Sequence, residues 1–226
     1  MAITETILRS RHQFFNEIRD NIGLWEKTRA MAISSIVLMA LYGAVMGSSH
    51  SLWQAISSAI KLPLLFLITA IICVPTLYFF NILFGAKQTL SQNLALILAP
   101  ITVTAILLFS FAAITLFFML TTSQYQFFKL LNVLFFAISG GIGVLFLVQG
   151  MRTVSATEES GSFTRQLVLI FWIGIYAFVG SQMAWTLRPF IGYPAAPFEL
   201  FRQQGGNFYA DILVSLGEIL GFFILK

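Results

Sequence analysis

The stretch from Leu62 to Leu120 contains a single charged residue, Lys87, and this feature constrains the fold more than any other. A bilayer core about 30 Å thick takes about 20 apolar residues per helical crossing, because a helix rises about 1.5 Å per residue. The stretch is therefore long enough for two crossings and the turn between them. It predicts a multi-pass membrane protein.

The composition of the whole chain supports this prediction. Charged residues make up 10% of the 226 positions and apolar residues 58%, and the mean hydropathy is +0.87. Soluble domains typically carry about 25% charged residues. The loops between apolar runs are short, which leaves no room for a separate soluble domain. We therefore expect an all-α integral membrane helix bundle.

Five crossings are clear in the hydropathy pattern, and together they predict a transmembrane bundle over residues 31–187. They are expected at Ala32–Gly47, Leu62–Phe84, Leu94–Leu120, Phe127–Gln149 and Leu167–Leu187. Pro75 and Pro100 fall inside the second and third crossings. Kinks are expected there rather than helix ends, because neighbouring helices can satisfy the backbone groups that a proline frees.

Residues 1–30 precede the first crossing and read as one amphipathic helix. Its apolar residues share an arc of about 100° at helical spacing. They are Ile3, Ile7, Phe14, Ile18, Ile22 and Trp25. The helix is expected either to lie on the cytoplasmic membrane surface, with Trp25 at headgroup level, or to dock on its own bundle or a partner. The side chains expected to contact the membrane or a partner are Ile7, Phe14, Ile18 and Trp25.

A second flanking segment, from Ser51 to Lys61, has an apolar face made by Leu52, Trp53, Ile56 and Ile60. It predicts a short interfacial helix that leads into Pro63, a residue suited to a helix start.

The orientation follows from the Lys and Arg residues of the short segments. If the N-terminus is inside, eight lie inside and four lie outside. The inner ones are Arg9, Arg11, Arg19, Lys27, Arg29, Lys87, Arg152 and Arg165, and the outer ones are Lys61, Lys129, Arg188 and Arg202. This bias predicts a cytoplasmic N-terminus.

Residues 188–226 form a tail with unusual local chemistry. Pro189, Pro194 and Pro197 exclude regular helix from its first part, and five aromatic residues predict an irregular loop that stays at the interface. A final helix is expected at Tyr209–Leu225. Its length is marginal for a crossing, so it is either a sixth membrane helix or an amphipathic surface helix.

Asp211, Ser215 and Glu218 share one face of that final helix, at positions i, i+4 and i+7. Acidic groups at membrane depth are costly and therefore indicate function. One interpretation is a proton or cation path, with Arg188 as counter-charge. The other is a polar stripe that faces water from a helix at the membrane surface.

No pattern in the sequence indicates catalysis or a cofactor. The chain has one cysteine, Cys73, and two histidines, His12 and His50, and it lacks a Ser/His/Asp set, an HExxH motif and a nucleotide-binding loop. Neither an enzyme, a metal site, a cofactor site nor a nucleic-acid partner is predicted. Pigment or quinone binding stays open, because the many phenylalanines can form apolar grooves.

Two sequence patterns resemble a known family. The first is Lys61-x-Pro63, followed by Cys73-x-Pro75-x-x-Tyr78-x-x-Asn81 and Gly85. The second is Arg188-Pro189-Phe190-x-Gly192-x-Pro194-x-x-Pro197-Phe198 with Gly206-Asn207-Phe208. Together they resemble a family of uncharacterised bacterial multi-pass membrane proteins, a likeness that covers most of the chain and implies no activity. The topology is also loosely similar to the Yip1 superfamily of five-span proteins, which are mostly non-enzymatic trafficking adaptors.

These observations favour a non-enzymatic integral membrane scaffold or accessory subunit in a bacterial plasma membrane or an internal photosynthetic membrane. Its expected partners are the lipid bilayer and other membrane subunits or further copies of the chain. The alternative is a small oligomeric transporter or channel for protons or cations that uses Asp211 and Glu218.

Overall fold

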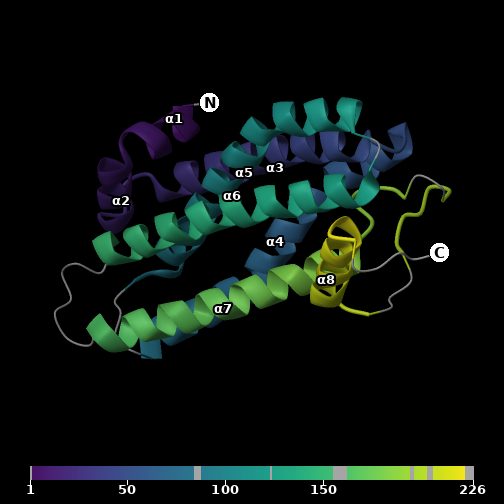
Figure 1. The fold of residues 1–226 in the computed structure, drawn as a ribbon. Helices are drawn as coiled ribbons and strands as arrows, with labels where there is room; N and C mark the ends of the chain where they lie inside the picture. The colour runs from purple at the N-terminus through teal and green to yellow at the C-terminus, as the bar shows by residue number, and fades with distance from the viewer. Residues whose placement is uncertain are drawn as a thin grey trace.

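The computed structural model describes residues 2–83, 88–122, 124–154, 162–193, 196–202 and 206–221. Within these ranges every regular element is an α-helix (Figure 1), which confirms the all-α prediction. The helices are α1 (Ala2–Arg9), α2 (Arg11–Arg19), α3 (Leu24–Gly47), α4 (Leu52–Leu83), α5 (Leu90–Thr121), α6 (Tyr125–Val154), α7 (Ser162–Leu187) and α8 (Phe208–Ile219).

Helices α3 to α7 are the five described helices that are long and apolar enough to cross a membrane. They indicate a membrane-embedded protein. All five begin earlier than the sequence pattern predicts, and the difference is largest for α3 and α4. Helix α3 starts at Leu24, so its first turns contain Lys27 and Arg29, which precede the apolar run. The expected interfacial helix at Ser51–Lys61 is not a separate element, because α4 runs unbroken from Leu52 through two internal prolines.

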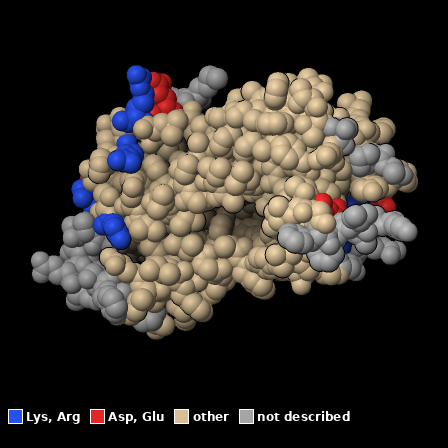
Figure 2. All heavy atoms as spheres, viewed as in Figure 1, with Lys and Arg blue, Asp and Glu red and all other residues tan. Residues whose placement is uncertain are grey.

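The five long helices form an open arc rather than a closed bundle. Neighbours along the arc are α6, α5, α3, α4 and α7, in that order. The two ends of the arc, α6 and α7, are separated by a hollow in the surface, which is visible in Figure 2. Helix α7 packs on α4 and on α8, and it is the least buried of the five long helices.

Helix α8 joins the two ends of the arc, since it packs against both α6 and α7 (Figure 1). It has 12 residues, which corresponds to about 18 Å of helix and is too short for a crossing of about 30 Å. The expected final helix at Tyr209–Leu225 is therefore shorter than predicted, and residues 222–226 lie outside the described ranges.

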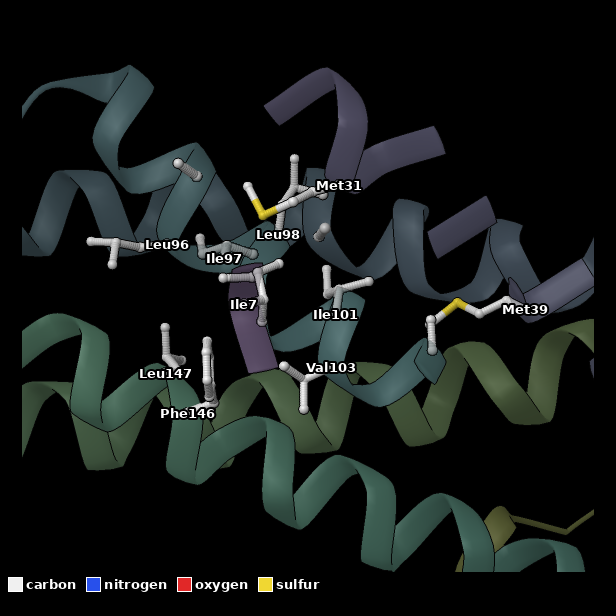
Figure 3. Close-up of a cluster of buried hydrophobic side chains, with 14 of the residues drawn as sticks. Ile7, Met31, Met39, Leu96, Ile97, Leu98, Ile101, Val103, Phe146 and Leu147 are labelled. Carbon is white, nitrogen blue, oxygen red and sulfur yellow. The ribbon is translucent and has the colours of Figure 1, made fainter. Parts of the chain in front are cut away.

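The apolar core lies between α3, α5 and α6 and receives side chains from α1 and α2. Figure 3 shows Ile7 of α1 among residues of α5, close to Met31 of α3. Deeper in the arc, the rings of Phe111 and Phe135 stack with centroids 4.4 Å apart. Apolar packing of this kind fills the space that the helix crossings leave.

Several polar side chains inside the arc bond to one another or to backbone. The Tyr42 hydroxyl donates to the Asn132 side-chain oxygen over 2.7 Å, and the Ser35 and Thr102 hydroxyls lie 3.0 Å apart. On α7, the Trp172 indole N–H donates to the Cys73 carbonyl over 3.1 Å, beside Pro75 of α4. These bonds join neighbouring helices, as expected for polar groups surrounded by hydrocarbon.

Candidate functional site

The most distinctive polar feature is a row of hydrogen-bond donors at the beginning of α4. His50 lies just before the helix, and Gln54, Ser58 and Lys61 follow at intervals of four, four and three residues. This spacing places the three helical residues on one side of α4. Lys61 is only 4% exposed, and Gln54 and Ser58 are fully buried. We call these four residues the donor row.

The donor row binds the irregular segment that follows α7, which we call the tail segment (residues 188–193 and 196–202). Gln54 donates to the Pro189 carbonyl over 2.8 Å, and Ser58 donates to the Phe190 carbonyl over 2.6 Å. The Lys61 ammonium lies 3.3 Å from the same Pro189 oxygen and also contacts the Leu200 carbonyl.

His50 completes the row, since its Nε2 lies 3.0 Å from the Ala196 carbonyl. The carbonyls need these donors because the prolines keep the tail segment from forming a helix of its own. Non-helical backbone near a membrane is tolerated where protein groups satisfy it. The donor row therefore fixes an irregular segment to the end of the helix arc.

Helix α3 lies tightly against the other side of this region. A Cβ at Gly43 or Gly47 would collide with backbone atoms of Ser58 or Gln54. The two glycines thus let α3 approach α4 closely where α4 carries the donor row. Close packing on one side and the tail segment on the other explain why these polar residues are buried.

The Lys61 ammonium is held without a carboxylate among the described residues. Besides the two carbonyls, it lies 4.8 Å from the centre of the Phe201 ring, which is within cation–π distance. Burying an ammonium costs free energy unless dipoles or counter-charges compensate for it. Carbonyl dipoles and an aromatic face provide that compensation here.

Two polar atoms near Lys61, Gln54 Oε1 and Ser57 Oγ, are buried without a hydrogen-bond partner among the described residues.

The predicted acidic site lies at the same end of the molecule, on α8. Asp211 and Glu218 are part-exposed, and Ser215 is buried with its hydroxyl bonded to the Asp211 carbonyl over 2.7 Å. The ion-pair partner of Asp211 is Lys129 of α6, at 3.0 Å. The predicted counter-charge, Arg188, lies close enough to Asp211 to feel its charge: burial lowers the pKa of Arg188, and attraction to Asp211 opposes that shift. The Arg188 guanidinium also lies 3.3 Å from the centre of the Trp185 ring.

The contact between Asp211 and Lys129 has a geometric cause. Arg188 directly follows α7 and starts the tail segment, whereas α8 packs along α6 and brings Asp211 to Lys129. A second polar contact, 2.9 Å between the Ser181 and Tyr209 hydroxyls, joins α8 to α7. The acidic helix therefore connects α6 and α7 at one end of the arc.

The N-terminal docking residues divide into two groups. Ile7, Phe14 and Ile18 are fully buried against the protein's own helices, whereas Trp25 is 76% exposed. The expected single helix contains two breaks, at Ser10 and at residues 20–23, and each break rotates the residues that follow. The prediction of a shared apolar face assumed one continuous helix. Trp25 belongs to α3 and therefore does not share the face of Ile7, Phe14 and Ile18.

Hydrogen bonds and an ion pair hold the second break against α5 and α3. The Gln92 amide of α5 donates to the carbonyls of Ile18 and Arg19, over 3.2 and 2.8 Å. The Lys27 ammonium lies 3.0 Å from a Glu17 carboxylate oxygen. Hydrogen bonds from Lys27 and then from Gln13 hold the pKa of Glu17 below its usual value, although partial desolvation opposes them.

Sequence reasoning did not identify the donor row, and its interpretation of residues 51–61 used only the apolar face. The polar residues Gln54, Ser57, Ser58 and Lys61 form the opposite face of the same segment. A helix with one polar face beside a proline-rich loop was a usable signal. To use that signal, the polar face of residues 51–61 has to be interpreted as the buried face of the helix.

No metal site accompanies these features in the described ranges, where no three His, Cys, Asp or Glu side chains form a group that could hold an ion. In comparisons with protein-family models, curated proteins and solved structures, nothing matches this chain. The two family resemblances noted above remain predictions.

Proposed function

We propose that this protein is a non-enzymatic membrane scaffold or accessory subunit, and that a transmembrane helix of a partner subunit packs between α6 and α7. The N-terminus would lie in the cytoplasm. The supporting observation is a contrast between two sets of glycines in the long helices.

The first set is used inside the protein. A Cβ at Gly143 would lie 2.5 Å from the Thr104 hydroxyl oxygen and 2.9 Å from the Pro100 carbonyl, so α5 and α6 need glycine there. Gly43 and Gly47 play the same part between α3 and α4. Small residues at helix crossings allow close backbone approach, which is a main source of helix association in membranes.

The second set has no such use within the described chain. At Gly140 and Gly141 of α6, and at Gly174 of α7, a Cβ would meet nothing within 4 Å. Glycine lowers helix stability by about 1 kcal/mol relative to alanine, which makes three open glycines in two helices costly. A partner helix that packs closely on this bare backbone would compensate for that cost.

The shape of the arc supports the same proposal. Phe136 of α6 stacks on Phe66 of α4, with ring centroids 6.4 Å apart. Gly140 lies one turn further along the same side of α6 and has no side chain. The hollow between α6 and α7 in Figure 2 is bordered by residues other than Lys, Arg, Asp and Glu, as suits the surface of a transmembrane helix.

The alternative, a proton or cation path through Asp211 and Glu218, has less support. Both acids lie on α8, whose 12 residues are too few to span a bilayer core, and Asp211 forms an ion pair with Lys129. The polar residues within the arc, such as Tyr42 and Asn132, bond to each other.

The proposal can be tested by filling the open glycine surface. Gly140→Leu with Gly141→Leu should leave the isolated protein folded and should remove associated membrane proteins from material purified in mild detergent. Quantitative mass spectrometry measures the associated proteins, and thermal unfolding of the purified variant measures its folding. The matched control is Ala113→Leu, which adds a side chain to an exposed small residue on α5. A partner set that is unchanged in the double variant, or that is lost equally in the control, would contradict the proposal.

A further inference from the structure

The junction between α2 and α6 brings two arginines from distant parts of the sequence together. Phe15 of α2 packs on Phe146 of α6, with ring centroids 4.9 Å apart, and fills the space beside Gly150. This contact places Arg11 next to α6, where its Nη1 lies 3.4 Å from the Gln149 side-chain oxygen.

Arg152 lies three residues beyond Gln149 on α6. Residues at this spacing are neighbours on a helix surface, so Arg11 and Arg152 both lie next to Gln149. All three side chains are exposed. Two cationic groups beside the same side chain repel each other, and an anion bound between them would remove that repulsion.

The pairing of the other arginines makes this junction distinctive. Arg9 forms an ion pair with Glu5 at 2.6 Å, and Arg19 forms one with Asp20 at 2.9 Å. In the described ranges, Arg11 and Arg152 have no carboxylate partner. Their charge is therefore available to a ligand.

The position of the junction indicates which anion it meets. It lies in the last turns of α6, where the fourth span leaves the membrane, and Lys and Arg side chains gather at this end of the molecule in Figure 2. Exposed Leu145 and Ile142 lie one and two turns below Gln149 on the same side of α6. The surface is thus apolar at membrane depth and cationic at its end.

We propose that this surface binds an anionic phospholipid, with the phosphate held by the guanidinium groups of Arg11 and Arg152 and an acyl chain lying along Ile142 and Leu145. Guanidinium groups bind phosphate oxygens through paired, charge-assisted hydrogen bonds. The apolar surface below them matches the remainder of the lipid and has no counterpart in free phosphate.

The test compares lipid binding to the full-length protein in detergent by native mass spectrometry and thermal unfolding. Wild-type protein should retain phosphatidylglycerol in preference to phosphatidylcholine, and phosphatidylglycerol should raise its melting temperature. Arg11→Gln with Arg152→Gln should weaken phosphatidylglycerol retention about tenfold or more, which is about 1.4 kcal/mol. Inorganic phosphate at the same concentration should neither bind nor displace the lipid.

The matched control is Arg9→Gln with Arg19→Gln, which removes the same charge from the same end of the molecule but affects arginines that already have acidic partners. It should retain phosphatidylglycerol as the wild type does. Three results would overturn the proposal: unchanged retention in the Arg11/Arg152 variant, equal loss in both double variants, or displacement of the lipid by inorganic phosphate. Since both arginines are exposed, the melting temperature without lipid should stay close to the wild-type value in each variant.

Discussion

The ring of Phe15 occupies the space that a side chain at Gly150 would need, since a Cβ at position 150 would lie 2.5 Å from Cε1 of that ring. Helix α2 can lie flat on α6 only because position 150 has no side chain. Gly150→Val should therefore push α2 away from the bundle, at a cost of about 1–3 kcal/mol to this contact.

The measurement is limited trypsin digestion, because the backbone at Arg11 and Arg19 can unfold into the protease when α2 detaches from the bundle. Cleavage in Gly150→Val should be faster than in wild type, while the long helices stay intact. Gly141→Val is the control, because position 141 has nothing within 4 Å of a Cβ. Equal digestion of the two variants would show that Phe15 does not hold α2 in place.

The ion pair between Glu17 and Lys27 predicts a pH dependence in the turn between α2 and α3. Hydrogen bonds lower the pKa of Glu17 from its usual value of 4.5. The pair therefore contributes fully above about pH 4.5, and its contribution is lost as the pH falls through the lower folded-state pKa. Amides in residues 14–22 should exchange hydrogen faster after equilibration at about pH 3.5 than at about pH 6, after correction for intrinsic rates. In Glu17→Gln this difference should shrink. An unchanged difference would assign the effect to another group.

Lys61 holds the tail segment through the Pro189 and Leu200 carbonyls. Lys61→Met keeps the apolar stem but leaves the Leu200 oxygen without this donor, at a cost of about 1–3 kcal/mol. Residues 196–202 should lose protection from hydrogen exchange, and trypsin should cleave faster at Arg202. Ile60→Met, at the exposed neighbouring position, should behave like wild type. Undiminished protection in Lys61→Met would mean that the other donors suffice.

Asp211 and Glu218 distinguish a scaffold from an ion carrier. Asp211 and Lys129 are partly exposed, so Asp211→Asn should cost less than about 1 kcal/mol. Glu218→Gln should change stability by less than about 0.5 kcal/mol. Proteoliposomes should show no proton or cation flux with wild type or with either variant. A wild-type flux that disappears in one variant would favour the transporter.

The charge bias predicts that the N-terminus is cytoplasmic and that the α5–α6 turn lies on the opposite side. Single cysteines at Leu8 and Thr121, both exposed, test this in a Cys73→Ser background. A membrane-impermeant maleimide should label Thr121→Cys in intact cells, and Leu8→Cys only after lysis. Labelling of both sites from outside would contradict the orientation.

The periodicity of apolar residues was sufficient to predict the five long helices, because hydrophobicity and length determine what a bilayer accepts. It was not sufficient for the ends of the helices. Whether Ser51–Lys61 joins α4 depends on the tail segment, more than one hundred residues later, which makes its polar face a buried one. The partner of Asp211 was missed for the same reason, since Lys129 is distant in sequence and only the packing of α8 on α6 brings it close.

The distance along the chain between Lys61 and the Leu200 carbonyl, 139 positions, also has a consequence for biosynthesis. At about 5–20 residues per second, a ribosome makes the acceptor roughly 7–28 s after it has made the donor. During that time the ammonium group must remain hydrated at the membrane surface, so α4 cannot settle to its final depth. A chain that ends before residue 188 would keep α4 in this state permanently, which would expose it to the proteases that remove incomplete membrane proteins.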